Sequence, residues 1–159
     1  FTPTDQSVRK LIAKMKLIPN ISLLREKKIV FCDDSIVRGT QLKDNVNHLY
    51  EYGAKEIHIR VSCPPLLHPC PFLNFSSSRG PLELIARRFI QSQEGSHDCK
   101  LDRYATTGSP EYNNLVEHIR AELKVATLEF NTVEQVVEAI GLPKCQICTH
   151  CFDGSSYGF

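Results

Sequence analysis

Two adjacent carboxylates followed by a glycine–threonine pair form the group of residues best suited to chemistry in this chain. Asp33 and Asp34 directly follow a short apolar run, and Gly39 and Thr40 stand where the pattern turns helical. The carboxylates can accept hydrogen bonds from vicinal sugar hydroxyls or approach a hydrated Mg²⁺. The backbone amides of residues 35–40, together with the helix N-terminus, can cradle a phosphate group. The loop therefore predicts a binding site for a phosphorylated sugar.

The same residue types also build ordinary turns. Asp34 and Ser35 can simply cap a turn, and Gly39 can simply relax it, because acidic, hydroxyl and glycine residues favour turns in any protein. In the functional interpretation, Ser35 and Thr40 add hydroxyl donors, and Gly39 lets the backbone approach the anion closely. An Asp-Asp-Ser string by itself favours the turn, so the ligand-binding interpretation depends on the longer string around it.

Clustered thiols are the second candidate for chemistry. The odd total of 7 cysteines argues against a closed disulfide framework and favours metal or redox chemistry in a reducing, cytoplasmic compartment. Cys145, Cys148 and Cys151 form a C-x-x-C-x-x-C run, and Cys70 follows a proline turn. This spacing lets two thiolates meet one metal centre, and zinc and iron–sulfur sites both use it. By spacing alone, zinc, an iron–sulfur cluster and reduced thiols without metal all stay open.

The elements that must position the acidic loop form a βαβ unit over residues 28–62. A strand is expected over Lys28–Cys32, a helix from about Thr40 to Tyr52, and a second strand over Glu56–Ser62. Strand, helix and strand in so short a span predict parallel neighbours joined by a right-handed crossover. Ligands in such sheets bind at the carboxyl ends of the strands, which is where the acidic pair lies.

The rest of the chain predicts further helices and one more strand. Helices are expected over 82–90, 115–123 and 133–140, with a strand over 126–130. Thr132 and Gln135 form a capping box for the third of these helices. Residues 91–111 are polar and rich in Gly, Ser, Thr and Asp, which predicts a mobile surface insertion. The fold class is therefore α/β with a parallel sheet and flanking helices.

Several other polar residues are interpreted as structural. His58 is expected to be a surface or packing residue on its strand. Cys32 and Cys63 lie in apolar sequence and are expected to be buried, unreactive thiols. Arg87 and Arg88 form a short basic run that indicates a solvated helix face.

Composition places limits on the class of protein. The chain has 159 residues, which fits one domain, and 42% hydrophobic and 23% charged residues, which are ordinary globular values. A net charge of +1 gives no basic field for nucleic acid, and no apolar run approaches the roughly 18 residues of a membrane span. The chain begins at Phe1 without a targeting leader, which suggests a fragment or a processed chain.

The longer string around the acidic pair resembles a known motif. Residues 29–40 resemble the phosphoribosyl pyrophosphate (PRPP) motif of type I phosphoribosyltransferases: apolar residues, two acids, then a loop with Gly and Thr. The version Asp-Asp-Ser-Ile-Val-Arg-Gly-Thr is similar to that of the glutamine phosphoribosylpyrophosphate amidotransferases (amidophosphoribosyltransferases). The similarity continues at Gly53–Val61, Cys63-Pro64-Pro65, His68-Pro69-Cys70, Leu84-Ile85-Ala86, Val136–Gly141 and Cys148–Gly154. It covers about 1–90 and 113–159, and is absent over 91–111.

The resemblance implies a fold, a reaction and a set of site residues. The chain looks like the carboxyl-terminal part of the phosphoribosyltransferase domain, in an enzyme whose glutamine-derived ammonia displaces pyrophosphate from PRPP to give 5-phosphoribosylamine, the first step of purine synthesis. The implied PRPP-binding residues are Asp33, Asp34, Ser35, Ile36, Val37, Arg38, Gly39 and Thr40. Mg²⁺ is expected at Asp33 and Asp34. Purine nucleotides are expected as feedback inhibitors, and a homo-oligomer as the assembly.

The two ends of the chain carry the remaining implied sites. Residues 1–19 are similar to the family's mobile loop, so Arg9 and Lys16 are candidates to approach the substrate phosphates, with solvated surface charges as the alternative. In the cysteine-rich tail, 143–159, the resemblance implies a [4Fe–4S] cluster on Cys70, Cys148 and Cys151, with a fourth ligand upstream of Phe1. Cys145 competes for the same role by spacing.

Three other functional interpretations stay open. The chain can be a catalytically silent PRPP-binding regulatory domain of the same fold, since such a domain keeps the ribose-phosphate loop. It can be a fragment that is inactive alone. The cysteine tail can also be a zinc-binding interaction module.

Overall fold

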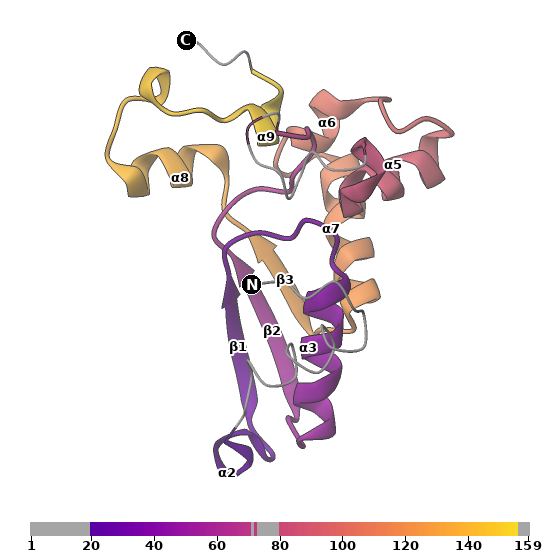
Figure 1. Ribbon diagram of the computed structural model, residues 1–159, viewed down its shortest axis with the longest axis vertical. Coiled ribbons are helices and arrows are strands. Elements are labelled where there is room, and N and C mark those ends of the chain that lie inside the picture. Colours follow the sequence, from indigo (N-terminus) through magenta and orange to yellow (C-terminus); the bar gives the residue numbers. More distant parts are fainter. Residues whose placement is uncertain (1–19, 71, 73–79, 156–159) are drawn as a thin grey trace.

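The fold is built around a parallel three-stranded sheet. The computed structural model describes residues 20–70, 72 and 80–155. Strands β1 (Lys28–Asp33), β2 (Glu56–Val61) and β3 (Thr127–Phe130) lie in the order β1-β2-β3, and both pairings are parallel. The three arrows in Figure 1 point the same way, so the carboxyl ends of the strands meet at one edge of the sheet. The expected α/β class with a parallel sheet is confirmed.

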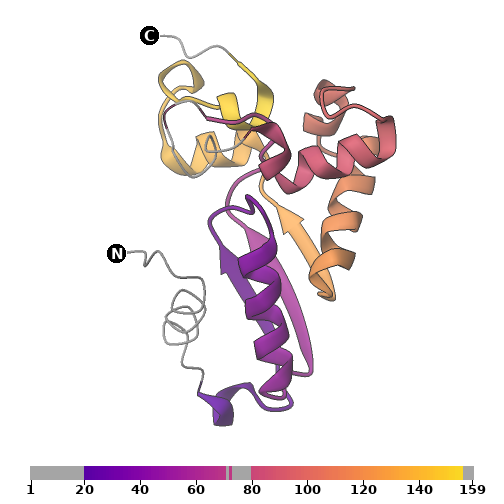
Figure 2. The ribbon, with the colours of Figure 1, turned by 45° about the vertical axis from the view of Figure 1, so that its right-hand side comes forward.

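Alternation along β2 gives the sheet one buried and one open face. Ile57, Ile59 and Val61 are buried, whereas His58 and Arg60 between them are only partly covered. Helices α3 (Thr40–Glu51) and α7 (Pro110–Leu123) cover the buried face (Figures 1 and 2). The sheet therefore buries apolar surface on one side, as the period-2 pattern predicts.

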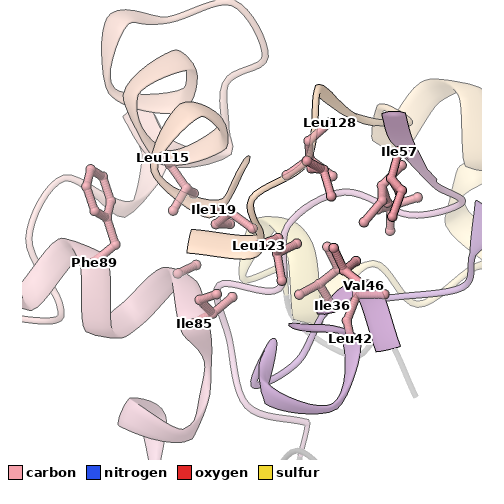
Figure 3. Packing of buried hydrophobic residues seen from close by; sticks show 14 of the residues in the cluster. Ile36, Leu42, Val46, Ile57, Ile85, Phe89, Leu115, Ile119, Leu123 and Leu128 are labelled. Atoms are coloured by element: carbon pink, nitrogen blue, oxygen red, sulfur yellow. The ribbon is translucent and has the colours of Figure 1, made fainter. Parts of the chain in front are cut away.

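The hydrophobic core lies between the sheet and these helices. Figure 3 shows side chains from α3 and from the loop before it pointing toward Ile57 and Leu123. The cluster continues past Leu123 toward Ile85, so the core ties the βαβ unit to the second half of the chain. The largest fully buried side chains are Ile57, Ile59, Leu67, Leu84, Ile90, Leu115, Ile119, Leu123, Val46 and Val61.

The βαβ unit has the expected bounds to within a residue or two. Leu42 and Val46 are four residues apart on α3 and both are buried, so one face of the helix meets the sheet. After α3 the chain turns at Gly53. Its φ is 91°, a positive value that glycine adopts more readily than other residues. The crossover from β1 through α3 to β2 therefore follows from local signals in the sequence.

The remaining elements in the described part of the chain are helices. Helix α8 spans Val133–Ile140 as expected, and the Thr132–Gln135 capping box is formed in both directions. Helix α7 begins earlier than expected because Ser109 caps it by accepting a hydrogen bond from the Tyr112 amide. The other elements are α2 (Ile21–Leu24), η1 (Pro81–Glu83), α5 (Ile85–Glu94), α6 (Leu101–Ala105), η2 (Lys144–Gln146) and α9 (His150–Asp153).

The segment 91–111 differs from the mobile surface loop that its composition indicates. It contains α6 and the beginning of α7, and Tyr104 on α6 is only 2% exposed within the core cluster. The Tyr104 ring meets Phe89 edge to face, and its hydroxyl donates to Glu94. Tyr104, with the partly buried Leu101 and Ala105 beside it, therefore packs this polar segment against the core.

Two further expectations about single residues are wrong. Arg87 is not solvated: it is 3% exposed, and its guanidinium donates to the carbonyls of Leu67 and His97. Cys32 is not buried, because its side chain points to the open face of β1, an edge strand. In both cases three-dimensional surroundings that lie far away in sequence decide the burial.

Some expected features lie outside the described residues. These are the segment 1–19 with Arg9 and Lys16, most of 71–79, and the end of the tail at 156–159. Among the helices of the described part, none is long and apolar enough to cross a membrane.

Candidate functional site

The acidic pair lies at the carboxyl end of β1, as the sequence predicts. Asp33 is the last residue of the strand and pairs with Val61 of β2, and its carbonyl accepts a 2.9 Å hydrogen bond from the Ser62 amide. Asp34 follows outside the strand and is exposed. The sheet thus fixes the backbone of Asp33, while the carboxylate of Asp34 is open to solvent.

The two carboxylates shape the start of the loop. The Asp33 carboxylate accepts a 3.0 Å hydrogen bond from the Asp34 amide, and the Asp34 carboxylate accepts a 2.7 Å hydrogen bond from the Ser35 amide. The amide of Ser35, one of those expected to cradle a phosphate, is therefore already satisfied in this conformation. The turn interpretation is correct for this one residue.

The following amides are differently placed. Within the described part of the chain, the amides of Ile36, Val37, Gly39 and Thr40 have no hydrogen-bond acceptor. Gly39 has φ 76° and directly precedes α3, so these amides lead into a helix N-terminus. The side chain of Ile36 is only 4% exposed and anchors the loop in the core. The loop therefore presents unsatisfied donors on a fixed backbone, which is what an anion site requires.

Negative charge gathers beside these donors. Burial, and then the neighbouring charge of Asp34, raise the pKa of Asp33 against the lowering effect of its hydrogen bond from the Asp34 amide. Cys63, just beyond β2, is affected too: burial first, then the charges of Asp34 and Asp33, raise the pKa of its thiol to about 12. Cys63 is thus a neutral thiol near the acidic pair, and the expectation that it is unreactive agrees with its environment.

Residues far along the chain contact this loop, and the sequence alone does not predict them. Glu83 forms an ion pair with Arg38, and Arg88 donates to the Arg38 carbonyl at 2.8 Å. The Ile85 amide donates to the Val37 carbonyl at 2.8 Å. No pattern in the sequence identifies these partners, because their effect depends on how α5 docks on the loop.

The tail is tied to the proline turn beside Cys70. The amides of Leu67 and His68 both donate to the carbonyl of Cys151, at 2.9 and 3.0 Å. Burial, then the nearby Cys70 thiol and then Cys148, raise the pKa of Cys151 to about 12. The fold therefore brings Cys151 to Cys70, as the expected ligand set requires.

The thiols do not complete a metal site by themselves. Among the residues described, no group of three or more His, Cys, Asp or Glu side chains is close enough to hold a metal ion. Cys148 and Cys145 are both exposed. The cysteines present thus fit part of a ligand set, and neither a [4Fe–4S] cluster nor zinc is favoured by their geometry.

Comparisons with known proteins connect this loop to a family. No family model matches the chain. It is 32% identical over 154 residues to the amidophosphoribosyltransferase of Methanothermobacter thermautotrophicus and 34% identical over 158 residues to that of Bacillus subtilis, each match covering 97% of the chain. The chain is a homologue of these amidophosphoribosyltransferases.

Solved structures agree with the sequence matches. The B. subtilis glutamine PRPP amidotransferase complexed with ADP and GMP superposes with a TM-score of 0.67 at 32% identity, covering 99% of this chain. A structure described as the allosteric regulatory enzyme of purine biosynthesis gives 0.63 at 28% identity. The alignments to amidophosphoribosyltransferases span nearly the whole chain, so they run through 91–111 rather than stopping on either side of it.

The similarity covers only part of each amidophosphoribosyltransferase. The chain spans about a quarter of the length of its curated relatives, 27% and 28% for the two named above, and 30% of the B. subtilis structure. The matched region is therefore only a part of a whole amidophosphoribosyltransferase.

Proposed function

We propose that this chain is part of the phosphoribosyltransferase domain of an amidophosphoribosyltransferase. In that reaction, ammonia released from glutamine displaces pyrophosphate from PRPP and gives 5-phosphoribosylamine, the first step of purine synthesis. The observation that carries the proposal is the acidic pair at the end of β1, followed by a loop of unsatisfied amides that opens α3. Homology to amidophosphoribosyltransferases over 97% of the chain supports it.

The loop residues have separate roles in this proposal. The carboxylates of Asp33 and Asp34 accept hydrogen bonds from the vicinal ribose hydroxyls. The amides of residues 36–40, together with the hydroxyls of Ser35 and Thr40, bind the 5-phosphate at the α3 N-terminus. The Arg38 side chain pairs with Glu83, so we assign its contribution to the backbone.

Mg²⁺ fits the chemistry of the acidic pair. Carboxylate oxygens are the ligands that Mg²⁺ accepts, and a cation would offset the charge of two adjacent carboxylates. The pKa of Asp33 is raised first by burial and then by the charge of Asp34. The ion would be held by Asp33 and Asp34 and would neutralise charge on the departing pyrophosphate. Arg9 and Lys16, outside the described residues, are proposed to approach the substrate phosphates.

Positioning and exclusion of water are the means of catalysis that this chain can supply. A loop fixed at Ile36 and at the carbonyls of Val37 and Arg38 holds the sugar phosphate in one orientation. Water competes with ammonia at the anomeric carbon, so closure over the site is part of the proposal.

The cysteines are proposed to hold a structural [4Fe–4S] cluster in the full-length protein. Cys70, Cys148 and Cys151 would supply three thiolates, and the contact between the tail and the proline turn supports this assignment. The cluster would tie the tail to the turn. Zinc in its place, or thiols without metal, are the other outcomes of the test given below.

Regulation is proposed from the nucleotides bound to a relative, and assembly and location from the sequence resemblance. The B. subtilis structure holds ADP and GMP, which supports purine nucleotides as feedback inhibitors of this protein. We also propose a homo-oligomer in the cytoplasm.

The test uses the full-length protein with Asp33→Asn and Asp34→Asn together. PRPP-dependent formation of phosphoribosylamine should fall by at least about a thousandfold, while glutamine hydrolysis stays measurable, because only the sugar-phosphate site loses its acceptors. The matched control replaces two exposed carboxylates elsewhere, Asp44→Asn with Asp102→Asn, and should leave both rates unchanged.

Other results would change the assignment. Unchanged synthesis in the Asp33/Asp34 variant would refute the site. Binding of PRPP by calorimetry to the unmodified protein without any product, lost in the variant, would instead support a silent PRPP-binding regulatory domain.

A further inference from the structure

The beginning of α5 is docked directly on the candidate phosphate loop. The amide of Ile85, in the first turn of α5, donates to the Val37 carbonyl at 2.8 Å. Amides in the first turn of a helix have no partner inside the helix, and among the described residues no side chain caps α5. The Val37 carbonyl thus accepts the hydrogen bond that an N-cap side chain would otherwise accept. The orientation of the loop therefore depends on the position of α5.

Arg88, one turn further along α5, makes the second connection. One guanidinium nitrogen donates to the Arg38 carbonyl at 2.8 Å, and another donates to the Glu83 carbonyl at 3.1 Å. Glu83 in turn forms an ion pair with the Arg38 side chain. Arg88 and Glu83 therefore hold Arg38 from both its backbone and its side chain.

These contacts determine where the loop amides point. In a trans peptide the C=O and the following N–H point in opposite directions. The Val37 carbonyl faces Ile85, so the Arg38 amide points away from α5; the Arg38 carbonyl faces Arg88, so the Gly39 amide points away from α5 as well. Because α5 binds the carbonyls of Val37 and Arg38, the amides of Arg38 and Gly39 both point to the side of the loop that faces away from α5. Consecutive amide donors that point the same way are what an anion cradle needs.

The helix that provides these contacts is itself held rigidly. Arg87 points away from the loop into the protein, where it donates to the carbonyls of Leu67 and His97 and pairs with Asp98. Gly39 packs so closely on α5 that an added Cβ would lie 2.7 Å from Cδ1 of Ile85. The loop therefore rests on a fixed surface.

We propose that Glu83 and Arg88 are positioning residues that orient the loop amides at 36–39 for a phosphate-bearing ligand. Neither is assigned a contact with the ligand; they act through the backbone of Val37 and Arg38. The identity of the ligand as PRPP depends on the proposed function, whereas the orientation of the loop does not.

The test compares Arg88→Met and Glu83→Gln with the control Arg120→Met in the full-length protein. Arg120 also donates to a carbonyl, that of Val125, and pairs with a carboxylate, Glu117, but it does so before β3, at the opposite edge of the sheet. Hydrogen exchange of the Ile85 amide, which donates to the Val37 carbonyl, is measured by mass spectrometry, alongside thermal unfolding and the steady-state constants for PRPP.

The expected result is specific to the loop. Arg88→Met should speed exchange of the Ile85 amide, because the loop carbonyl that accepts from it is held less firmly. The same variant should raise KM for PRPP at least about tenfold, because a charge-assisted hydrogen bond is lost, with a smaller change in kcat. Glu83→Gln should also speed amide exchange and raise KM for PRPP, but by less than Arg88→Met. Arg88→Lys should recover only part of the loss, because an ammonium cannot span both carbonyls as the planar guanidinium does.

Two outcomes would overturn the inference, and they are distinct from failure of the proposed function. If exchange of the Ile85 amide in the Arg88 and Glu83 variants equals that in Arg120→Met, the two residues do not position the loop. An equal rise in KM in the Arg120 control would also contradict it. If the unmodified protein neither binds nor uses PRPP, the proposed function fails, and the exchange data still decide whether Arg88 and Glu83 orient the loop.

Discussion

At the scale of single residues, adjacent arginines on α5 have different surroundings. Arg87 is 3% exposed and donates to the carbonyls of Leu67 and His97, while Arg88 is partly exposed and donates to the Arg38 carbonyl of the candidate loop. Successive residues of a helix point about 100° apart, so neighbours in sequence need not share an environment. A basic pair therefore need not be a solvated face.

Gly39 provides a prediction at this scale. Gly39→Ala should lower the free energy of unfolding by about 2 kcal/mol or more, because an L residue in the left-handed region costs about 1–2 kcal/mol and the new methyl group also meets Ile85. Gly95→Ala is the matched control: its φ is also 76°, but no described residue lies within 4 Å of a Cβ added there, so it should show the backbone cost alone. Chemical denaturation measures both.

A double variant separates the two contributions. With Ile85→Val the Cδ1 atom is gone, so the cost of Gly39→Ala in that background should approach the cost of Gly95→Ala. If Gly39→Ala costs no more than Gly95→Ala in the unmodified background, the close packing of the loop on α5 is contradicted.

At the scale of elements, α5 connects three parts of the chain. Its first turn holds the loop after β1, Arg87 reaches the carbonyls of Leu67 and His97, and Phe89 meets Tyr104 of α6. The candidate loop, the proline turn and the polar segment therefore share one helix as their support. Damage to any of these contacts is expected to reduce stability.

The Arg87–Asp98 ion pair gives a pH-dependent prediction. The hydrogen bond from Arg87 is the largest effect on Asp98 and lowers its pKa below the ordinary 3.8. Ionised Asp98 therefore stabilises the fold fully above about pH 4, and that stabilisation is lost as pH falls through the lowered pKa. Asp98→Asn should be less stable than the unmodified protein at neutral pH, and the difference should shrink in acid.

Urea denaturation at a series of pH values measures this difference. Asp102→Asn, which changes an exposed carboxylate of α6 outside this contact, serves as the control and should show no such convergence. A difference for Asp98→Asn that stays constant down to about pH 2 would mean that the ion pair makes no contribution.

At the scale of the whole molecule, the cysteine-rich tail packs against the proline turn that precedes Cys70. Leu67 and His68 hold the Cys151 carbonyl, and Gly154 lies so close to the His68 ring that a Cβ added to it would be 2.7 Å from the ring. This arrangement brings Cys151 to Cys70 across about 80 residues of sequence. Any metal bound there would cross-link the two ends of this region.

The metal content of the full-length protein tests that proposal. Anaerobic purification should give brown protein with about four irons and four sulfides per chain, by the stoichiometry of a [4Fe–4S] cluster. Cys151→Ser should lose the colour, whereas Cys99→Ser, at a partly buried thiol on the polar segment, should keep it. Colourless protein with one zinc and no sulfide would exclude the cluster and favour the zinc module.

The sequence by itself determined the elements whose signals are local. The alternation of Ile57, Ile59 and Val61 predicted β2 and its buried face, and the capping box at Thr132 set the beginning of α8 to the residue. The acidic pair was correctly placed at the carboxyl end of a parallel strand, because side-chain periodicity and turn chemistry act over a few residues.

Only the tertiary structure decided features that depend on distant contacts. Three features need partners from other elements. They are the burial of Arg87, the packing of Tyr104 in a polar segment, and the contacts of Glu83 and Arg88 with the loop. The satisfied amide of Ser35 shows the same limit at short range, since its acceptor depends on the rotamer of Asp34. Burial and hydrogen bonding are properties of the packed chain, so residue type and spacing alone do not specify them.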